Sequence, residues 1–217
     1  MEEKFDSVYE EDGRFYTRNL RQGQKVYGEK LVGRDGDEYR EWVPDRSKLS
    51  AALKNDLENF PIKPGDKVLY LGAGQGTTAS HVSDIVGSKG MVYLVEFSER
   101  AVRDLLKTCE QRENTAPILA DARKPDEYPW VENVDVLYED VAQPDQVNIL
   151  KRNADRFLKK GGHFVLAVKS RAMDVTKDPE DIYSEVEENL EEKFEVMESV
   201  VLDPWEEDHC LFVGRKV

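Results

Sequence analysis

Beyond residue 60 the chain alternates between short apolar runs and amphipathic stretches, and this alternation limits its fold more than any other feature. The apolar runs predict five strands, over 67–71, 91–97, 116–120, 134–140 and 163–169. The stretches after them have helical periodicity, over 77–86, 99–112, 146–158 and 179–190. Two strands, 194–202 and 209–216, then follow without a helix between them. The pattern predicts an α/β fold with a doubly wound, mostly parallel, seven-stranded Rossmann-like sheet and an antiparallel insertion at one edge.

The first 46 residues follow a different pattern. Short β-type runs are separated by turn signals such as Asp12-Gly13 and Gly36-Asp37, and they lie at 5–9, 13–19, 30–34 and 37–42. We therefore expect a small antiparallel β region over 1–46. A helix predicted over 47–60, stopped by Pro61, then opens a second unit over 47–217.

Composition excludes several classes of protein. No apolar run approaches the ~20 residues that span a bilayer, and the first residues lack the basic and apolar regions of a signal peptide. The two cysteines, Cys109 and Cys210, are too few for a disulfide framework. We expect a cytoplasmic protein with no membrane partner.

The net charge of −14 is unevenly distributed along the chain. Residues 178–209 contain 14 Asp or Glu and a single basic residue, Lys193, whereas residues 13–34 contain six Arg or Lys and one acid, Glu29. The acidic run is by itself typical of a solvated helix face. An acidic chain should bind nucleic acid weakly without specificity, but a partner can still place it on RNA.

A glycine-rich turn follows the strand at 67–71. Its glycines let the backbone approach a ligand, and the helix that follows offers free amide groups. A dinucleotide-binding fingerprint would place its third glycine at position 77, which is Thr77 here. The turn favours an adenosyl ligand over NAD, with a merely tight turn as the alternative. Its candidate ligand contacts are Gly72, Gly74, Thr77 and Thr78.

Acidic residues end the next three strands, at Glu96, Asp121 and Asp140. Ligands of doubly wound sheets bind beyond the carboxyl ends of the strands, so three such acids favour one shared site over three surface residues. Glu96 can accept both hydroxyls of an adenosine ribose, Asp121 can contact the adenine, and Asp140 lies beside the methionine half and the substrate. The predicted cofactor is S-adenosylmethionine, on a class I methyltransferase fold, with further contacts from Phe97, Ala122, Val141, Ala142 and Gln143.

Seven motifs resemble the fibrillarin family in order and spacing. They are RSKLSAAL (46–53), GTTASHVSDIVG (76–87), VEFSER (95–100), DARKP (121–125), DVAQPDQ (140–146), DVTKDP (174–179) and DPWEEDHCLFVGR (203–215). The resemblance covers nearly the whole chain. It implies a ribose 2′-O-methyltransferase that acts on pre-rRNA and, in archaea, tRNA. The chain lacks a glycine–arginine-rich extension, as the archaeal form does, and it departs from the family pattern at Gly74-Gln75 and at Trp205.

The resemblance also implies partners and catalytic residues. The partners would be a box C/D guide RNA, the target rRNA or tRNA, a Nop-domain scaffold protein and a kink-turn-binding relative of a ribosomal protein. The family's catalytic tetrad corresponds to Lys48, Asp140, Lys169 and His209. A carboxylate can accept the proton of a ribose hydroxyl, and ammonium groups can stabilise the alkoxide.

The residues bear on three other functions. The histidines lack metal-ligand spacing and no nucleophile elbow is present, which argues against a metal site and a hydrolase. A stand-alone methyltransferase on another substrate, or a mainly structural ribonucleoprotein subunit, remain as alternatives. Titration with S-adenosylmethionine tests the structural alternative, because a pure scaffold need not bind it.

Overall fold

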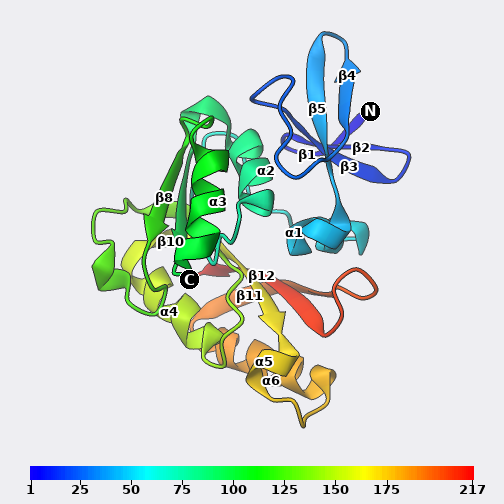
Figure 1. Cartoon of the computed structure of the whole chain (residues 1–217). Coiled ribbons are helices and arrows are strands. Elements are labelled where there is room, and N and C mark those ends of the chain that lie inside the picture. The colour runs from blue at the N-terminus through cyan, green and yellow to red at the C-terminus, as the bar shows by residue number, and fades with distance from the viewer.

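The computed structural model describes residues 1–217, which form two separate β-sheets (Figure 1). The first sheet is antiparallel, in the order β1-β2-β3-β5-β4. Its strands are β1 (Glu2–Phe5), β2 (Val8–Glu11), β3 (Arg14–Arg18), β4 (Leu31–Arg34) and β5 (Asp37–Trp42). The predicted strand over 5–9 is wrong. Asp6 and Ser7 form the turn between β1 and β2, with Ser7 in the left-handed region at φ 63°.

The second sheet confirms the predicted fold class. Its order is β11-β12-β10-β9-β6-β7-β8. Strand β12 runs antiparallel to both of its neighbours, and the five strands from β10 to β8 pair in parallel. The strands are β6 (Lys67–Leu71), β7 (Met91–Glu96), β8 (Thr115–Leu119), β9 (Val134–Glu139), β10 (Leu158–Lys169), β11 (Phe194–Val201) and β12 (His209–Lys216). Parallel strands all end at one edge, so this topology brings the acidic strand ends together.

Helices cover both faces of the second sheet and create two apolar clusters. One face packs against α1 (Lys48–Lys54), α2 (Thr77–Val86) and α3 (Glu99–Cys109), and the other against α4 (Gln146–Phe157) and α6 (Pro179–Glu191). The short elements are α5 (Ser170–Met173), η1 (Pro44–Arg46), η2 (Gly87–Lys89) and η3 (Pro125–Glu127). None of the helices is both long enough and apolar enough to cross a membrane.

Helix α1 is shorter than the predicted helix over 47–60. It ends at Lys54, and Asp56 adopts a left-handed φ of 63° that stops the helix. The Asn55 side chain donates to the carbonyls of Val201 and Asp203 instead of supporting another turn. The apolar residues beyond this point, Leu57, Phe60 and Ile62, still pack into the core. The spacing of the apolar residues therefore predicted correctly which side chains are buried, but it predicted a helix longer than the one that forms.

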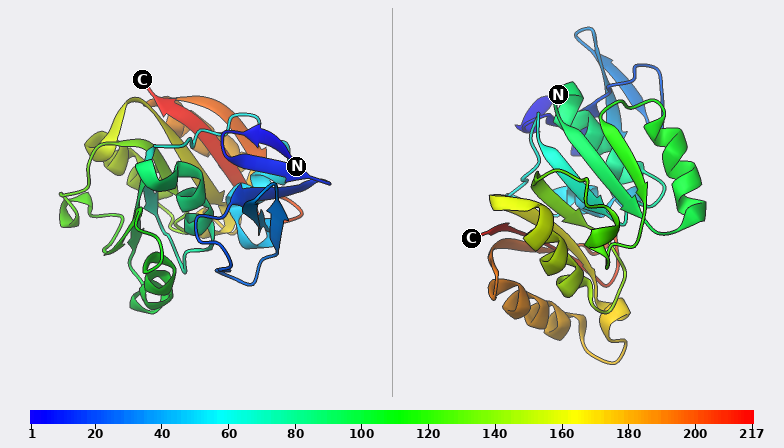
Figure 2. Two further views of the ribbon diagram at one scale, coloured as in Figure 1. Left: turned by 90° about the horizontal axis from the view of Figure 1, so that it is seen from above. Right: turned by 90° about the vertical axis from the view of Figure 1, so that its left-hand side faces the viewer.

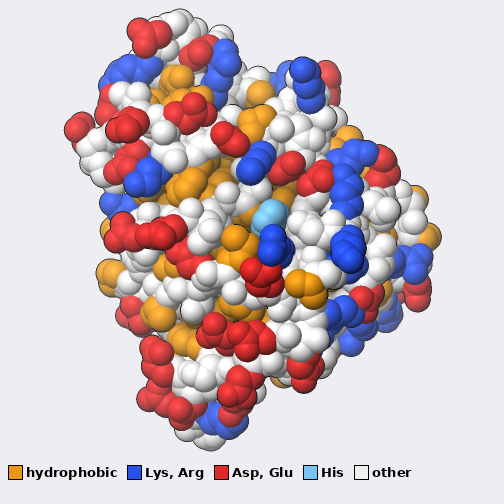
Figure 3. All heavy atoms as spheres, turned by 180° about the vertical axis from the view of Figure 1, so that it is seen from behind, with side chains coloured by type: hydrophobic (Ala, Val, Ile, Leu, Met, Phe, Trp, Pro, Cys, Tyr) orange, Lys and Arg blue, Asp and Glu red, His pale blue; other side chains and the backbone are white.

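Exposed acidic side chains are concentrated at one end of the molecule. The N-terminal sheet lies at the top of the right-hand view of Figure 2 and α6 at the bottom. Acidic side chains gather at the lower end of the face shown in Figure 3, over the α6 region. The exposed acids of α6 and the following strand are Glu180, Asp181, Glu185, Glu188, Glu191, Glu192 and Glu195.

Candidate functional site

A cavity of about 280 Å³ opens at the carboxyl ends of β6, β7 and β9. All but two of the predicted cofactor contacts line it: Gly72, Gly74, Glu96, Phe97, Asp121, Ala122, Asp140, Val141, Ala142 and Gln143. The two exceptions are Thr77, which lines a separate cleft, and Thr78, which is buried. Four further lining residues, which sequence reasoning missed, are Val95, Ala120, Arg123 and Ile149.

Gly72 lines the cavity where two backbone segments approach each other closely. Its φ is +80°, and a Cβ placed there would lie 2.4 Å from the Asp140 carbonyl oxygen. Its amide donates to the Val95 carbonyl, while the Asp140 amide donates to the Leu71 carbonyl, at 2.9 Å each. Only glycine combines this backbone conformation with this close approach. The turn and the end of β9 therefore form one cradle that a side chain at position 72 would fill.

The Glu96 carboxylate is fixed before any ligand arrives. It is 7% exposed, its Oε2 accepts from the Gly74 amide at 2.9 Å, and its Oε1 accepts from the Ser98 amide at 2.8 Å. A carboxylate has about four acceptor positions. Two therefore stay available for hydroxyl groups that enter the cavity.

Asp121 and Phe97 border the cavity differently. Arg123 donates to both oxygens of Asp121 at 2.7–3.0 Å, and this hydrogen bonding lowers the pKa of Asp121. Phe97 is 70% exposed although its side chain is large and apolar. An exposed aromatic face beside a fixed carboxylate suits a flat heterocycle with polar edges.

Lys48 and Asp140 form an ion pair at the cavity. The Lys48 Nζ lies 2.9 Å from Asp140 Oδ1 and 3.1 Å from Oδ2, and both side chains are about four-fifths buried. Burial lowers the pKa of Lys48, but the Asp140 carboxylate outweighs this effect, so the pKa is raised overall. Lys48 is therefore an ammonium at neutral pH.

The adjacent acid, Glu139, belongs to the core and not to the site. It is fully buried with no hydrogen-bond partner, and burial raises its pKa well above the usual range. Neighbouring strand residues point to opposite faces of a sheet. Of the two carboxyl groups at the end of β9, only Asp140 thus faces Lys48.

Lys169 and His209 are direct cross-strand neighbours on β10 and β12. Lys169 is exposed, whereas His209 is 6% exposed and its Nδ1 lies 2.7 Å from the Glu207 carbonyl. Burial lowers the pKa of His209, and the nearby Lys48 ammonium lowers it further. The four residues predicted as a tetrad therefore gather at one end of the sheet.

Comparison with known proteins identifies the family of this chain. The sequence profile of the Fibrillarin family matches residues 1–217. This chain belongs to the fibrillarin family. It is 56% identical to the fibrillarin-like rRNA/tRNA 2′-O-methyltransferase of Thermococcus sibiricus, across 98% of this chain and 97% of that relative. The family predicted from the motifs is confirmed.

Three solved fibrillarin structures are similar to this chain. The Methanococcus jannaschii fibrillarin pre-rRNA processing protein has a TM-score of 0.95 at 49% identity, covering 99% of this chain and 96% of that one. Aeropyrum pernix fibrillarin, with natively bound S-adenosyl-L-methionine, has a TM-score of 0.86 at 48% identity, covering 93% and 88%. A fibrillarin in complex with Nop5p has a TM-score of 0.90 at 40% identity, covering 97% and 98%.

One link in this fibrillarin-family site was invisible in the sequence. Thr78 Oγ1 donates to Ser47 Oγ at 2.9 Å, and Ser47 is the N-cap of the helix that begins at Lys48. Both hydroxyls are buried. The glycine turn and the catalytic lysine candidate are thereby fixed relative to each other. Residues 31 positions apart carry no local signal of such a contact.

Proposed function

We propose that this fibrillarin-family protein is the catalytic subunit of a guide-directed box C/D ribonucleoprotein. In this role it methylates ribose 2′-hydroxyls of pre-rRNA and tRNA. The observation that carries the proposal is the Lys48–Asp140 ion pair, placed beside Lys169 and His209 at the rim of an adenosyl-sized cavity. The similarity to the rRNA/tRNA 2′-O-methyltransferase of Thermococcus sibiricus supports it.

The cavity fits S-adenosylmethionine, the ligand of the Aeropyrum pernix relative. In our proposal Glu96 accepts the ribose hydroxyls, Asp121 contacts the adenine edge, and Phe97 covers the adenine face. The segment from Asp140 to Gln143 holds the methionine half. When bound, this cofactor supplies an electrophilic sulfonium methyl group. The chain itself supplies position and charge, which are the main needs of an in-line methyl transfer.

Asp140 is the proposed acceptor for the proton of the attacking hydroxyl. The ion pair with Lys48 holds this carboxylate in place at the edge of the cavity. Lys169 forms no ion pair within the protein, so its ammonium group can stabilise the developing alkoxide. Geometry and charge support these roles, which the kinetics of Asp140 and Lys169 variants test.

His209 has a defined tautomer in this proposal. The Glu207 carbonyl oxygen only accepts hydrogen bonds, so the His209 Nδ1 carries the hydrogen that it receives. Because the pKa of His209 is lowered, the ring is neutral at pH 7 and its Nε2 is a free acceptor. His209 thus suits orienting a substrate hydroxyl better than neutralising a phosphate.

Partners would position the RNA. The complex of a related fibrillarin with Nop5p supports a Nop-domain scaffold as one of them. A guide RNA and a kink-turn-binding protein complete the proposed particle. The acidic surface over α6 disfavours RNA, so docking by the scaffold must orient the enzyme. A reducing cytoplasm is the proposed location, which suits the free, buried Cys109 and Cys210.

A methyl-transfer assay with tritiated cofactor and a guide–target duplex tests this function. It is run at fixed moderate salt, with and without the scaffold and kink-turn proteins. We expect turnover in the full assembly and little with the chain alone. Strong activity of the chain alone, not improved by the partners, would favour a stand-alone enzyme. Binding of S-adenosylmethionine without turnover in the full assembly would favour a structural subunit.

A further inference from the structure

A second, polar cleft of about 420 Å³ lies on the other side of the glycine turn from the cofactor cavity. Gln75 and Thr77 of the turn line this cleft, whereas Gly72 and Gly74 line the cavity. The basic residues of the cleft are Arg21, Lys25, Arg46, Lys107 and Arg112, against one acid, Asp104. Its lining thus carries four more positive than negative side chains in a protein whose net charge is −14.

Three of these cations are available to a ligand. Lys25 is exposed and takes part in no ion pair within the protein. Arg46 only lies over the Tyr27 ring, at 5.8 Å from its centroid. Arg21 lies 3.9 Å from Glu113, whose side chain is 97% exposed, and such surface pairs contribute little. The other two cations are already paired, Lys107 with Asp104 and Arg112 with Asp84.

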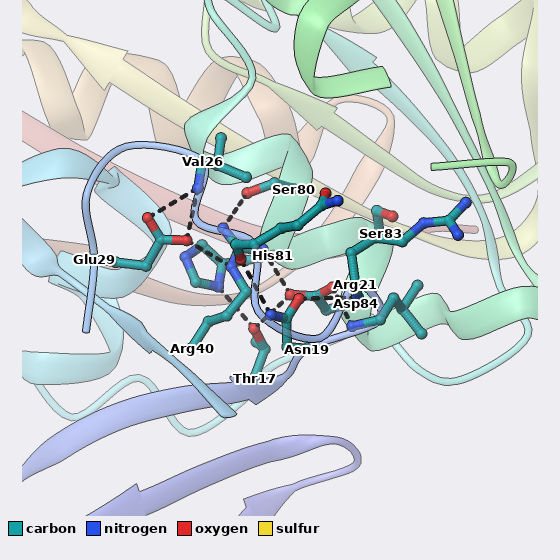
Figure 4. A network of polar contacts seen from close by, with 12 residues as sticks. Thr17, Asn19, Arg21, Val26, Glu29, Arg40, Ser80, His81, Ser83 and Asp84 are labelled. Atoms are coloured by element: carbon teal, nitrogen blue, oxygen red, sulfur yellow. Dashed lines mark hydrogen bonds and ion pairs between the residues drawn. The ribbon is translucent and has the colours of Figure 1, made fainter. Parts of the chain in front are cut away.

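A buried polar network holds the cation-bearing loop, residues 19–30, in place (Figure 4). The Leu20 amide donates to Asp84 at 3.1 Å, and the Tyr27 amide donates to Glu29 at 2.8 Å. Arg40 bridges Glu29 and Asp84, with 2.7 Å contacts to each and with all three side chains fully buried. The cleft is therefore formed in advance, which reduces the entropy lost when a ligand binds.

We propose that this cleft binds backbone phosphates of the target RNA strand, next to the ribose held at Asp140. The inference rests on the proposed function and adds to it a second contact with the substrate. Arg46 precedes Lys48 by two residues, so their Cα atoms lie within about 7 Å of each other. The lining has only two apolar residues, Val26 and Tyr27, which suits phosphate better than the apolar centre of a protein interface.

The test is a double variant, Lys25→Ala with Arg46→Ala, in the assembled particle. Each phosphate contact to a single strand contributes a salt slope of about 0.7, or about fivefold in affinity at 0.1 M salt. We expect the KM for target RNA to rise about 25-fold and the salt slope to fall by about 1.4. The kcat and the Kd for S-adenosylmethionine should not change. A matched control is Lys89→Ala with Lys160→Ala, two exposed lysines outside the cleft, which should leave KM unchanged.

A second variant guards against a folding defect from the loss of the Arg46–Tyr27 contact. Lys25→Glu changes one exposed side chain and should raise KM more than Lys25→Ala does. Unchanged KM and salt slope in a folded double variant would overturn the inference. So would loss of scaffold binding in the absence of RNA, which would make the cleft a protein-docking site. If inorganic phosphate displaced target RNA from the cleft completely, the cleft would be a site for a free anion, which would also overturn the inference.

The proposed function and this inference can fail separately. Binding of labelled guide–target duplex to the assembly, measured without cofactor, reports on the cleft even if no methyl group is transferred. A wild-type assembly that binds through Lys25 and Arg46 but never methylates would refute the function alone. An assembly that methylates its target, and whose affinity for RNA does not change when Lys25 and Arg46 are replaced, would refute only the proposed role of the cleft.

Discussion

Replacement of Glu96 tests the cofactor site most directly. Its two oxygens already accept from the Gly74 and Ser98 amides, so Glu96→Ala removes both protein contacts together with those proposed for the ribose. Hydrogen bonds to a charged group contribute about 1.5–3 kcal/mol. The Kd for S-adenosylmethionine should therefore rise roughly 10- to 150-fold. Two amides left without their acceptor should also lower the free energy of unfolding by about 2 kcal/mol.

Glu96→Gln sharpens this prediction. A glutamine has one acceptor oxygen, so its NH₂ group must face either the Gly74 or the Ser98 amide, donor against donor. We expect a loss of affinity close to that of the alanine variant. The charge-matched control is Glu99→Ala, an exposed acid three residues along. Calorimetric titration gives the Kd and thermal unfolding gives the stability. A folded Glu96→Ala variant with wild-type affinity would refute the assignment.

Three further predictions concern the catalytic residues and the buried network. Asp140→Ala and Lys169→Ala should each abolish most turnover in the full assembly, and the double variant should be barely worse than either; additive losses in kcat would show that the two act independently. Thr78→Val removes the hydroxyl that donates to Ser47 but keeps the shape of the side chain, so it should lower kcat with little effect on the Kd for cofactor. Equal losses of turnover and of cofactor affinity would contradict a role in positioning Lys48. Burial and two nearby arginines lower the pKa of His81 well below 6.5, so only the unfolded state binds a proton there as the pH falls below 6.5. Wild-type stability in urea should thus fall below pH 6.5 by about 1.4 kcal/mol per pH unit more than that of a folded His81→Asn variant, and parallel pH profiles would refute this.

The sequence alone determined the class of fold and most of the residues that line the cavity. Helical and strand periodicities are local, so they survive without knowledge of the rest of the chain. The strand-end acids Glu96, Asp121 and Asp140 could be grouped because parallel strands end at one edge, whatever their spacing in the chain. The motifs of the fibrillarin family then supplied Lys48, which no pattern of spacing would have selected.

Tertiary structure decided which of these groups meet and in what state. The Lys48–Asp140 pair joins residues 92 positions apart, and the pKa shifts of both Lys48 and His209 arise from burial and from charges brought near by packing. Sequence position puts the basic stretch over 13–34 within the N-terminal β region and gives it no link to the glycine turn. Instead, the buried Arg40–Asp84 contact folds its loop against α2, so Arg21 and Lys25 reach the glycine turn. The free energy of such a buried ion pair depends on how deeply both charges are buried and how closely they approach, and tertiary packing sets both.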